Sequence, residues 1–204
     1  MINNNISKQF IYEIFRKTNE TFICCQVNFK NKKNKKNFIN IDSYYLKHLL
    51  DHFSINSQIN LNLNLLGDNY IDEHHITEDL GVTLGKCIKY FIPLKFKNYI
   101  NRYGFYYVPL DESLSRVVID VSGRSYLSYN IYYNNFYIKN FNINLIYDFF
   151  LSFSNNSFIT IYIDNIIGYN IHHIFETVFK AFGKSLKESL ILNNNINSTK
   201  KLLF

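Results

Sequence analysis

The spacing of apolar residues along the chain predicts a mixture of helices and strands. Where apolar positions recur every three and four residues we expect helices, over 43–56, 74–91, 145–156 and 172–190. Alternating patterns indicate strands, over 59–66, 105–110, 115–123, 125–133 and 157–163. The middle three strands would form a meander, and turns at 67–69 and 168–170 would precede the two long helices.

Two parts of the chain resemble one another. HHITEDLGVTLGKCIK (74–89) and HHIFETVFKAFGKSLK (172–187) share seven of sixteen residues, and the segments 48–63 and 148–163 also align. We therefore predict an α+β fold in which sheets pack on helices and duplicated half-domains share one core. The repeats would cover roughly 16–100 and 101–192 of a single domain spanning 1–204, with a C-terminal tail at 193–204.

Positive charge is densest in KNKKNKK at 30–36, which lies between the alternating stretches ETFICCQVNFK and NFINI. Aromatic residues do not alternate with these lysines, so the run lacks the usual pattern of a nucleic-acid contact. We expect residues 30–37 to form a solvated loop of a hairpin.

The composition narrows the class of protein. The chain has 204 residues, of which 47% are hydrophobic and 19% charged, so it is not a disordered chain. Three cysteines make no disulfide framework, and neither a membrane span nor a signal peptide is evident, which predicts a cytoplasmic protein. The 30 Asn, 28 Ile and 18 Lys beside one Ala and four Arg suggest a mutational bias. The net charge of +6 weakly favours an anionic partner.

The six histidines are unevenly placed, and four of them form the two pairs that open the repeated helices. In the pattern His-His-x-x-Glu on a helix, both histidines lie near the glutamate, about 100° apart around the axis. Imidazole and carboxylate together suit Mn²⁺, Fe²⁺, Zn²⁺ or Ni²⁺. Duplicated polar residues at a helix N-terminus, without a metal, are the alternative.

Longer motifs point to one family. The stretches IDEHHITED, DVSGRSY and HHIFETVFKAFGKSL, together with RKTNET, YLKHLLDHF and STK, resemble imidazoleglycerol-phosphate dehydratase over about residues 16–200. The resemblance implies dehydration of imidazole glycerol phosphate to imidazole acetol phosphate in histidine biosynthesis. It also implies two divalent metal ions per active site, Mn²⁺ above all, with ligands from neighbouring subunits. The assembly would be a hollow homo-oligomer of twenty-four subunits built from trimers.

The same resemblance implies roles for individual residues. The metal ligands would be His48, His74, His75, Glu78, His172, His173 and Glu176. Glu20 would be the general acid/base, and Glu78 and Glu176 would also be catalytic, while Asp79 and Asp111 would orient ligands. Phosphate would be bound by Arg102, Arg124, Lys180, Ser198 and Lys200. Glu20 could instead be a surface strand residue, Lys180 a solvated helix lysine, and Asp79 and Asp111 turn or helix-face residues; Arg116 is expected to be structural.

This chain departs from the family pattern at several positions. Tyr162 stands where the family has a ligand histidine, and a neutral phenol is a poor ligand, so one metal should bind more weakly. Lys47 replaces an aspartate, Asn56 replaces a histidine, and Lys201 replaces a glycine. His52 replaces a glutamine, and we favour a helix-face residue over a compensating ligand.

These departures leave alternatives to an active dehydratase. A catalytically weakened structural member of the same family is the first, because of Tyr162 and Lys47. A module that binds anions or nucleic acid through a basic surface is the second, and the lack of an aromatic–basic motif argues against it. We expect a small phosphorylated imidazole substrate, with no nucleic acid and no membrane as partner.

Overall fold

The computed structural model describes residues 11–29, 37–67, 73–96, 100–134 and 136–193. The first half begins with a sheet in the spatial order β1-β2-β4-β3. Its elements are β1 (Ile11–Lys17), β2 (Thr21–Phe29), β3 (Phe38–Asn40), α1 (Tyr44–Ser57), β4 (Ile59–Gly67) and α2 (His74–Phe96). Strand β2 is antiparallel to both β1 and β4, whereas β3 pairs with β4 in parallel.

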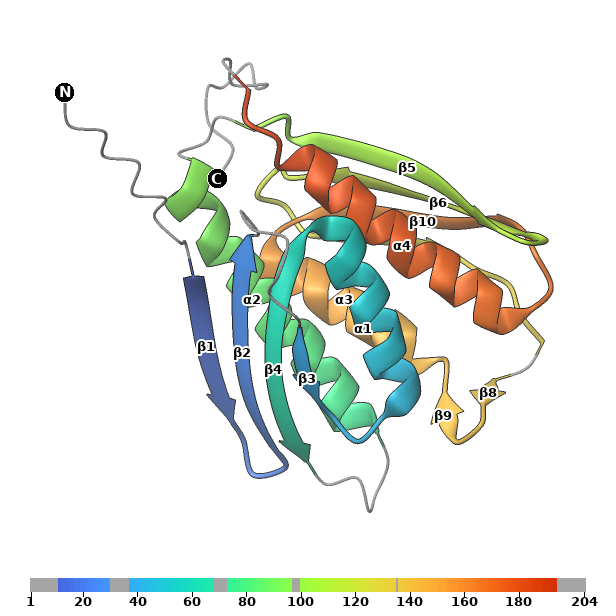
Figure 1. The fold of residues 1–204 in the computed structure, drawn as a ribbon, viewed down its shortest axis with the longest axis horizontal. Helices are drawn as coiled ribbons and strands as arrows, with labels where there is room; N and C mark the ends of the chain where they lie inside the picture. Colours follow the sequence, from blue (N-terminus) through green and yellow to red (C-terminus); the bar gives the residue numbers. More distant parts are fainter. Residues whose placement is uncertain (1–10, 30–36, 68–72, 97–99, 135, 194–204) are drawn as a thin grey trace.

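The second half repeats this topology (Figure 1). Its elements are β5 (Tyr103–Leu110), β6 (Ser113–Asp120), β7 (Tyr126–Asn130), α3 (Leu145–Ser157), β10 (Thr160–Ile167) and α4 (Ile171–Ser189), with a small hairpin of β8 (Tyr137–Ile138) and β9 (Phe141–Asn142). The spatial order β5-β6-β10-β7, with β7 parallel to β10, matches that of the first sheet. The α+β class and the duplicated halves are thus confirmed, while the boundaries at 16–100 and 101–192 stay predictions.

Two expected strand pairings are wrong. The segments that flank the basic run, β2 and β3, form no hairpin with each other, because β4 lies between them. The meander holds for β5 and β6, but β10 separates β6 from β7. In both halves a strand from later in the chain inserts between two earlier ones, which local alternation cannot reveal. The basic run at 30–36 and the tail from 194 onwards lie outside the described residues.

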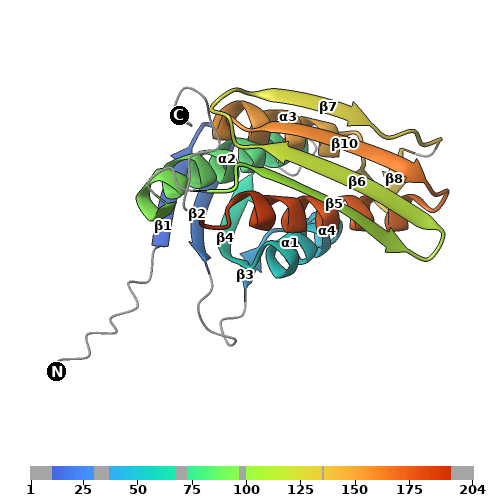
Figure 2. The ribbon, with the colours of Figure 1, turned by 90° about the horizontal axis from the view of Figure 1, so that it is seen from above.

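The four long helices lie between the two sheets (Figure 2). Helices α1 and α2 pack on the first sheet, α3 and α4 on the second, and the layers join through α2 against α3 and α1 against α4. Phenylalanines fill the space where the helices meet; Phe53, Phe149, Phe150, Phe153, Phe179 and Phe182 are all buried and in ring contact. Among the helices that the structure describes, none combines the length and the hydrophobicity that a membrane span requires.

The helix contacts are close because a glycine lies at each. A Cβ on Gly183 of α4 would lie 2.7 Å from the carbonyl oxygen of Phe53, and a Cβ on Gly85 of α2 would lie 2.7 Å from that of Phe153. Backbone on both sides leaves no room for a side chain. These two contacts between the halves bring α1 against α4 and α2 against α3. The histidine pair at the start of α2 and the pair at the start of α4 are thereby each placed beside the opposite half.

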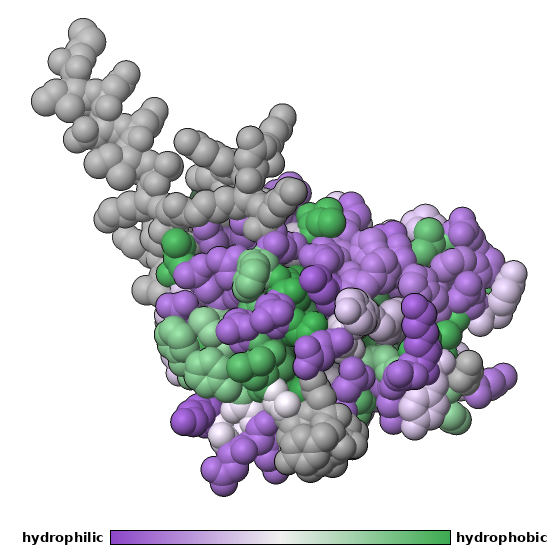
Figure 3. Space-filling view, turned by 60° about the horizontal axis from the view of Figure 1, so that its bottom comes forward, coloured by the Kyte–Doolittle hydropathy of each residue, from purple (hydrophilic) through white to green (hydrophobic). Residues whose placement is uncertain are grey.

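The outer face of the first sheet carries apolar side chains. Phe15, Phe22, Phe38 and Leu66 are all exposed, and Phe22 pairs directly across the strands with Leu66. Apolar side chains gather on the side of the molecule where this sheet lies (Figure 3). Such a patch is typical of a surface that contacts another protein.

Candidate active site and metal centre

Three histidines surround the carboxylate of Glu176. On α1, His48 Nε2 lies 3.2 Å from Glu176 Oε2 and His52 Nε2 lies 3.3 Å from Oε1. On α4, His172 Nε2 lies 3.4 Å from Oε2. Because α1 belongs to the first half and α4 to the second, the packing of the two halves assembles this group, which we call the Glu176 cluster.

The start of α4 is fixed by its cap. The side-chain oxygen of Asn170 accepts a hydrogen bond from the backbone N–H of His172 at 3.0 Å. An asparagine at this position satisfies a donor that the first helical turn would otherwise leave free. The cap therefore sets the register that places His172 and Glu176, four residues apart, on the face towards α1.

Glu176 is held as a carboxylate. Its side chain is only 11% exposed, and burial alone would raise the pKa of the carboxyl. The hydrogen bond from Lys180, whose Nζ lies 2.6 Å from Oε1, acts with His52 and His48 to outweigh burial and lower that pKa to about 2. Burial is also the main reason why the pKa of His52 is lowered, which favours the neutral imidazole that a metal requires.

The second histidine of this pair has other partners. His173 Nδ1 lies 2.8 Å from Glu112 Oε2, and its Nε2 lies 3.8 Å from Asp111 Oδ2. The hydrogen bond with Glu112 is the main cause of a raised pKa at His173, and the same bond lowers the pKa of Glu112 to about 2. Glu112 was missed by the sequence analysis, although it follows Asp111 in a motif that the family resemblance covers.

The two histidines at the start of α2, His74 and His75, likewise have different partners. His74 Nε2 lies 3.9 Å from Glu78, while His74 Nδ1 lies 3.7 Å from Asp148 Oδ2 on α3. His75 Nδ1 lies 3.5 Å from Glu20 Oε2. The first histidine of each pair therefore lies by the following glutamate as expected, and the second lies beside a carboxylate from elsewhere in the fold. Asp148 was missed, although it aligns with His48 in the repeat.

Asp79 ties the first sheet to α2. Its carboxylate accepts a hydrogen bond from Arg16 at 2.5 Å and another from Thr21 at 2.5 Å. Thr21 directly follows Glu20, and Asp79 directly follows Glu78. These bonds can therefore hold the backbone beside Glu20 and Glu78, and the orienting role expected for Asp79 stays a prediction.

The expected phosphate residues that the structure describes have different partners. Arg102 donates two hydrogen bonds to Asp120, at 2.6 Å and 3.0 Å, and Lys180 is bound to Glu176. Arg124 is exposed. Ser198 and Lys200, like Lys201, lie outside the described residues. Arg116, expected to be structural, contacts Asp164 at 2.9 Å and the Tyr107 hydroxyl at 3.0 Å.

Tyr162 points away from the Glu176 cluster. It lies on β10 between Ile161 and Ile163, which are fully buried against the helices, so its own side chain projects from the outer face of the sheet and is 45% exposed. The centroid of its ring lies 5.7 Å from the centroid of the Tyr126 ring. The Tyr162 side chain therefore lies on the opposite face of the sheet from the Glu176 cluster of its own chain. Lys47 is exposed on α1.

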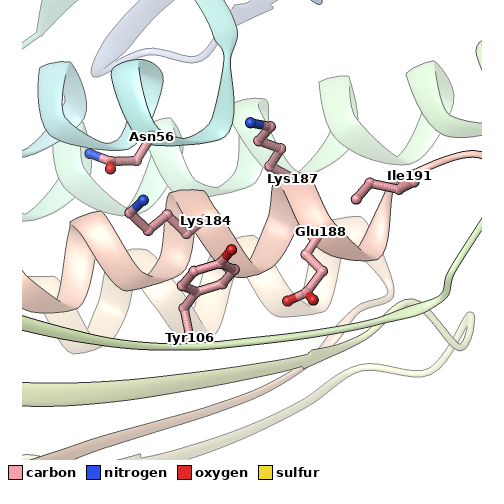
Figure 4. A pocket seen from close by; sticks show the side chains of 6 residues that line it. All are labelled: Asn56, Tyr106, Lys184, Lys187, Glu188 and Ile191. Carbon is pink, nitrogen blue, oxygen red and sulfur yellow. The ribbon is translucent and has the colours of Figure 1, made fainter.

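A separate pocket of about 150 Å³ lies between the C-terminal end of α1, the C-terminal half of α4 and strand β5. Asn56, one turn beyond His52, lines it together with Lys184, Lys187, Tyr106, Glu188 and Ile191 (Figure 4). Lys184 lies against the Tyr106 ring, 5.3 Å from its centroid. None of the expected ligands lines this pocket, so its residues serve as controls for the cluster.

Comparison with known proteins gives one consistent result. A family model described as imidazoleglycerol-phosphate dehydratase matches residues 42–186. Enzymes of that name are 40% identical to this chain in Pseudomonas putida, over 89% of this chain and 90% of the relative, and 40% identical in Cupriavidus metallidurans, over 95% and 99%.

Solved structures carry the same name. The Staphylococcus aureus enzyme superimposes with a TM-score of 0.80 at 34% identity, covering 90% of this chain and 99% of its own. The Pyrococcus furiosus enzyme gives 0.80 at 27% identity, covering 93% and 100%.

Proposed function

Because the chain belongs to the imidazoleglycerol-phosphate dehydratase family, and is therefore a hydro-lyase of histidine biosynthesis, we propose that it converts imidazole glycerol phosphate to imidazole acetol phosphate with bound divalent metal. The observation that carries the metal dependence is the convergence of His48, His52 and His172 on the carboxylate of Glu176.

The residues fit a divalent cation. Three imidazoles and an ionised carboxylate, with no thiolate, form a donor set for a first-row metal such as Mn²⁺. Donor atoms of His48, His52 and Glu176 lie within 4.8 Å of one another. His74, Glu78 and Asp148 form a second, looser group at the equivalent place in the repeat. When bound, the metal would supply Lewis-acid stabilisation of negative charge on the imidazole ring of the substrate.

Glu20 is the residue best placed to move a proton. Its carboxylate lies 3.5 Å from His75 Nδ1, and its side chain is 52% exposed, so it can meet a substrate that enters from solvent. The reaction removes a proton from the carbon beside the imidazole ring and expels hydroxide from the next carbon. A carboxylate that accepts the first proton and returns one to the leaving hydroxide would serve both steps.

Phosphate binding is assigned to Arg102, Arg124, Lys180, Ser198 and Lys200. Asp120 holds the guanidinium of Arg102 in place. A planar guanidinium held in this way can donate hydrogen bonds from its remaining N–H groups to phosphate oxygens. Lys180 adds positive charge beside the Glu176 cluster.

We further propose that the site is completed by other copies of the chain, within a cytoplasmic homo-oligomer of twenty-four subunits built from trimers. Within one chain the expected ligands fall into separate groups around Glu176, Glu112, Glu78 and Glu20. The exposed apolar face of the first sheet provides a surface for contact with another copy.

The alternative is a weakened member of the same family, favoured by Tyr162 in place of a ligand histidine. Purified protein assayed with the phosphorylated substrate distinguishes the two. Product that chelation abolishes and Mn²⁺ restores would support the metal-dependent dehydratase. A correctly assembled protein that gives no product with Mn²⁺ would support the alternative.

A further inference from the structure

We propose that His52 is itself a metal ligand of this chain, joining His48, His172 and Glu176 around one divalent cation. The proposal rests on the metal dependence proposed above and adds a donor that the family pattern does not supply at this position. It also reverses our preference from the sequence for a helix-face residue.

The distances place His52 within the cluster. Its Nε2 lies 3.3 Å from Glu176 Oε1, as close as the Nε2 of His48 and of His172 lie to Oε2, at 3.2 Å and 3.4 Å. A first-row cation lies about 2.0–2.2 Å from each nitrogen or oxygen ligand, so the donors around it are about 3–4 Å apart. Small side-chain shifts would bring all four donors to such a cation.

The helix gives His52 the same direction as His48. The two residues are four apart on α1 and therefore lie on one face, which here is packed against α4. Their rings meet edge-on with centroids 4.5 Å apart. Two histidines at i and i+4 on one helical face are a recurrent way to hold a metal ion.

Burial argues against a solvated helix-face residue. The side chain of His52 is 22% exposed, against 41% for His48 and 43% for His172, which the family resemblance already assigns as ligands. His52 lies deepest of the three, beside the buried carboxylate. Lys180 Nζ, 2.6 Å from the same oxygen atom of Glu176, is the positive charge that a bound cation would have to displace.

Manganese titration tests the proposal. In the full-length protein freed of metal by chelation, His52→Gln should weaken Mn²⁺ binding at the Glu176 cluster by more than about 10-fold. Even the loss of a residue that only orients a ligand typically costs about 10–100-fold in metal affinity. In protein loaded with one Mn²⁺ per chain, X-ray absorption should count one imidazole fewer than in wild type. Lys187→Ala, at an exposed position on α4 that lines the separate pocket, should change neither result.

The outcomes separate this proposal from the proposed function. If wild type binds Mn²⁺ tightly while His52→Gln keeps the same affinity and the same imidazole count, His52 is not a ligand, although the metal dependence stands. An affinity loss with an unchanged count would make His52 a positioning residue and would also overturn the proposal. If wild type binds no Mn²⁺, both proposals fail. Circular dichroism of the metal-free variants confirms that each remains folded.

Discussion

His48 and Asp148 occupy equivalent positions in the two halves, and each approaches the first histidine of the pair in the opposite half. The ring centroids of His48 and His172 lie 5.3 Å apart, and Asp148 Oδ2 lies 3.7 Å from His74 Nδ1. The repeat has thus kept the position and changed the residue. A carboxylate beside a ligand imidazole can orient the ring and strengthen it as a ligand.

We expect Asp148→Asn to weaken Mn²⁺ binding at the site that contains His74 and Glu78, by about 10–100-fold. Binding at the Glu176 cluster should be unchanged. Isothermal titration of the metal-free protein measures both sites in one experiment. An equal loss at both sites would contradict a local role for Asp148.

Glu20→Gln should lower kcat by about 10²–10⁴-fold at saturating Mn²⁺, because the amide cannot exchange a proton with the substrate. The matched control is Glu13→Gln, which changes an exposed carboxylate on β1, the neighbouring strand of the same hairpin. Its kcat should equal that of wild type. Unchanged kcat in Glu20→Gln would make Glu20 a surface strand residue.

Wild type should bind one Mn²⁺ tightly and a second more weakly, since Tyr162 offers a neutral phenol where the family has an imidazole. Tyr162→His should tighten the weaker site in the assembled oligomer. Electron paramagnetic resonance of free Mn²⁺ during a titration gives both affinities.

The control for that experiment is Tyr126→His, which adds an imidazole on the adjacent strand, close to Tyr162. It should leave the weaker site unchanged. Two equally tight sites in wild type would rule out the explanation from Tyr162.

The ion pair between Glu112 and His173 should make stability depend on pH in the metal-free protein. His173 has a pKa above its unfolded value of 6.5, so its contribution is complete below pH 6.5 and is lost as pH rises through the folded pKa. Glu112 has a pKa lowered from 4.5 to about 2, so its contribution is complete above pH 4.5 and is lost as pH falls towards 2.

The destabilisation caused by Glu112→Gln should therefore be greatest between about pH 4.5 and 6.5 and smaller on either side. Urea unfolding at a series of pH values, with wild type and variant compared at each, provides the measurement. A difference in unfolding free energy that is constant from pH 5 to pH 9 would show that the pair does not contribute.

Gly183→Ala should destabilise the fold by about 1–3 kcal/mol, because the new methyl group meets the backbone of Phe53 and Ser57 and forces α4 away from α1. Lys187→Ala, at an exposed position one turn further on the same helix, should change the free energy of unfolding by less than about 0.5 kcal/mol. Chemical denaturation of the two variants beside wild type compares them directly.

The sequence by itself determined the local elements and the existence of the repeat. Helices α1, α3 and α4 begin and end within one residue of their expected limits, because their apolar positions follow a helical period over three or more turns. Strand β10 begins three residues later than expected, since α3 runs to Ser157 and Phe158 then adopts a left-handed backbone with φ of 56°. The motifs shared with the family were also evident in the sequence, because they are contiguous.

Only the tertiary structure decided which residues meet. Strand order depends on insertions of β4 and β10 that join residues distant in the chain, so the hairpin and part of the meander were wrong. The partners of the second histidines, Glu20 and Glu112, come from other strands and turns for the same reason. His52 joins Glu176 only because glycine lets α1 and α4 approach closely, a contact between residues more than a hundred positions apart.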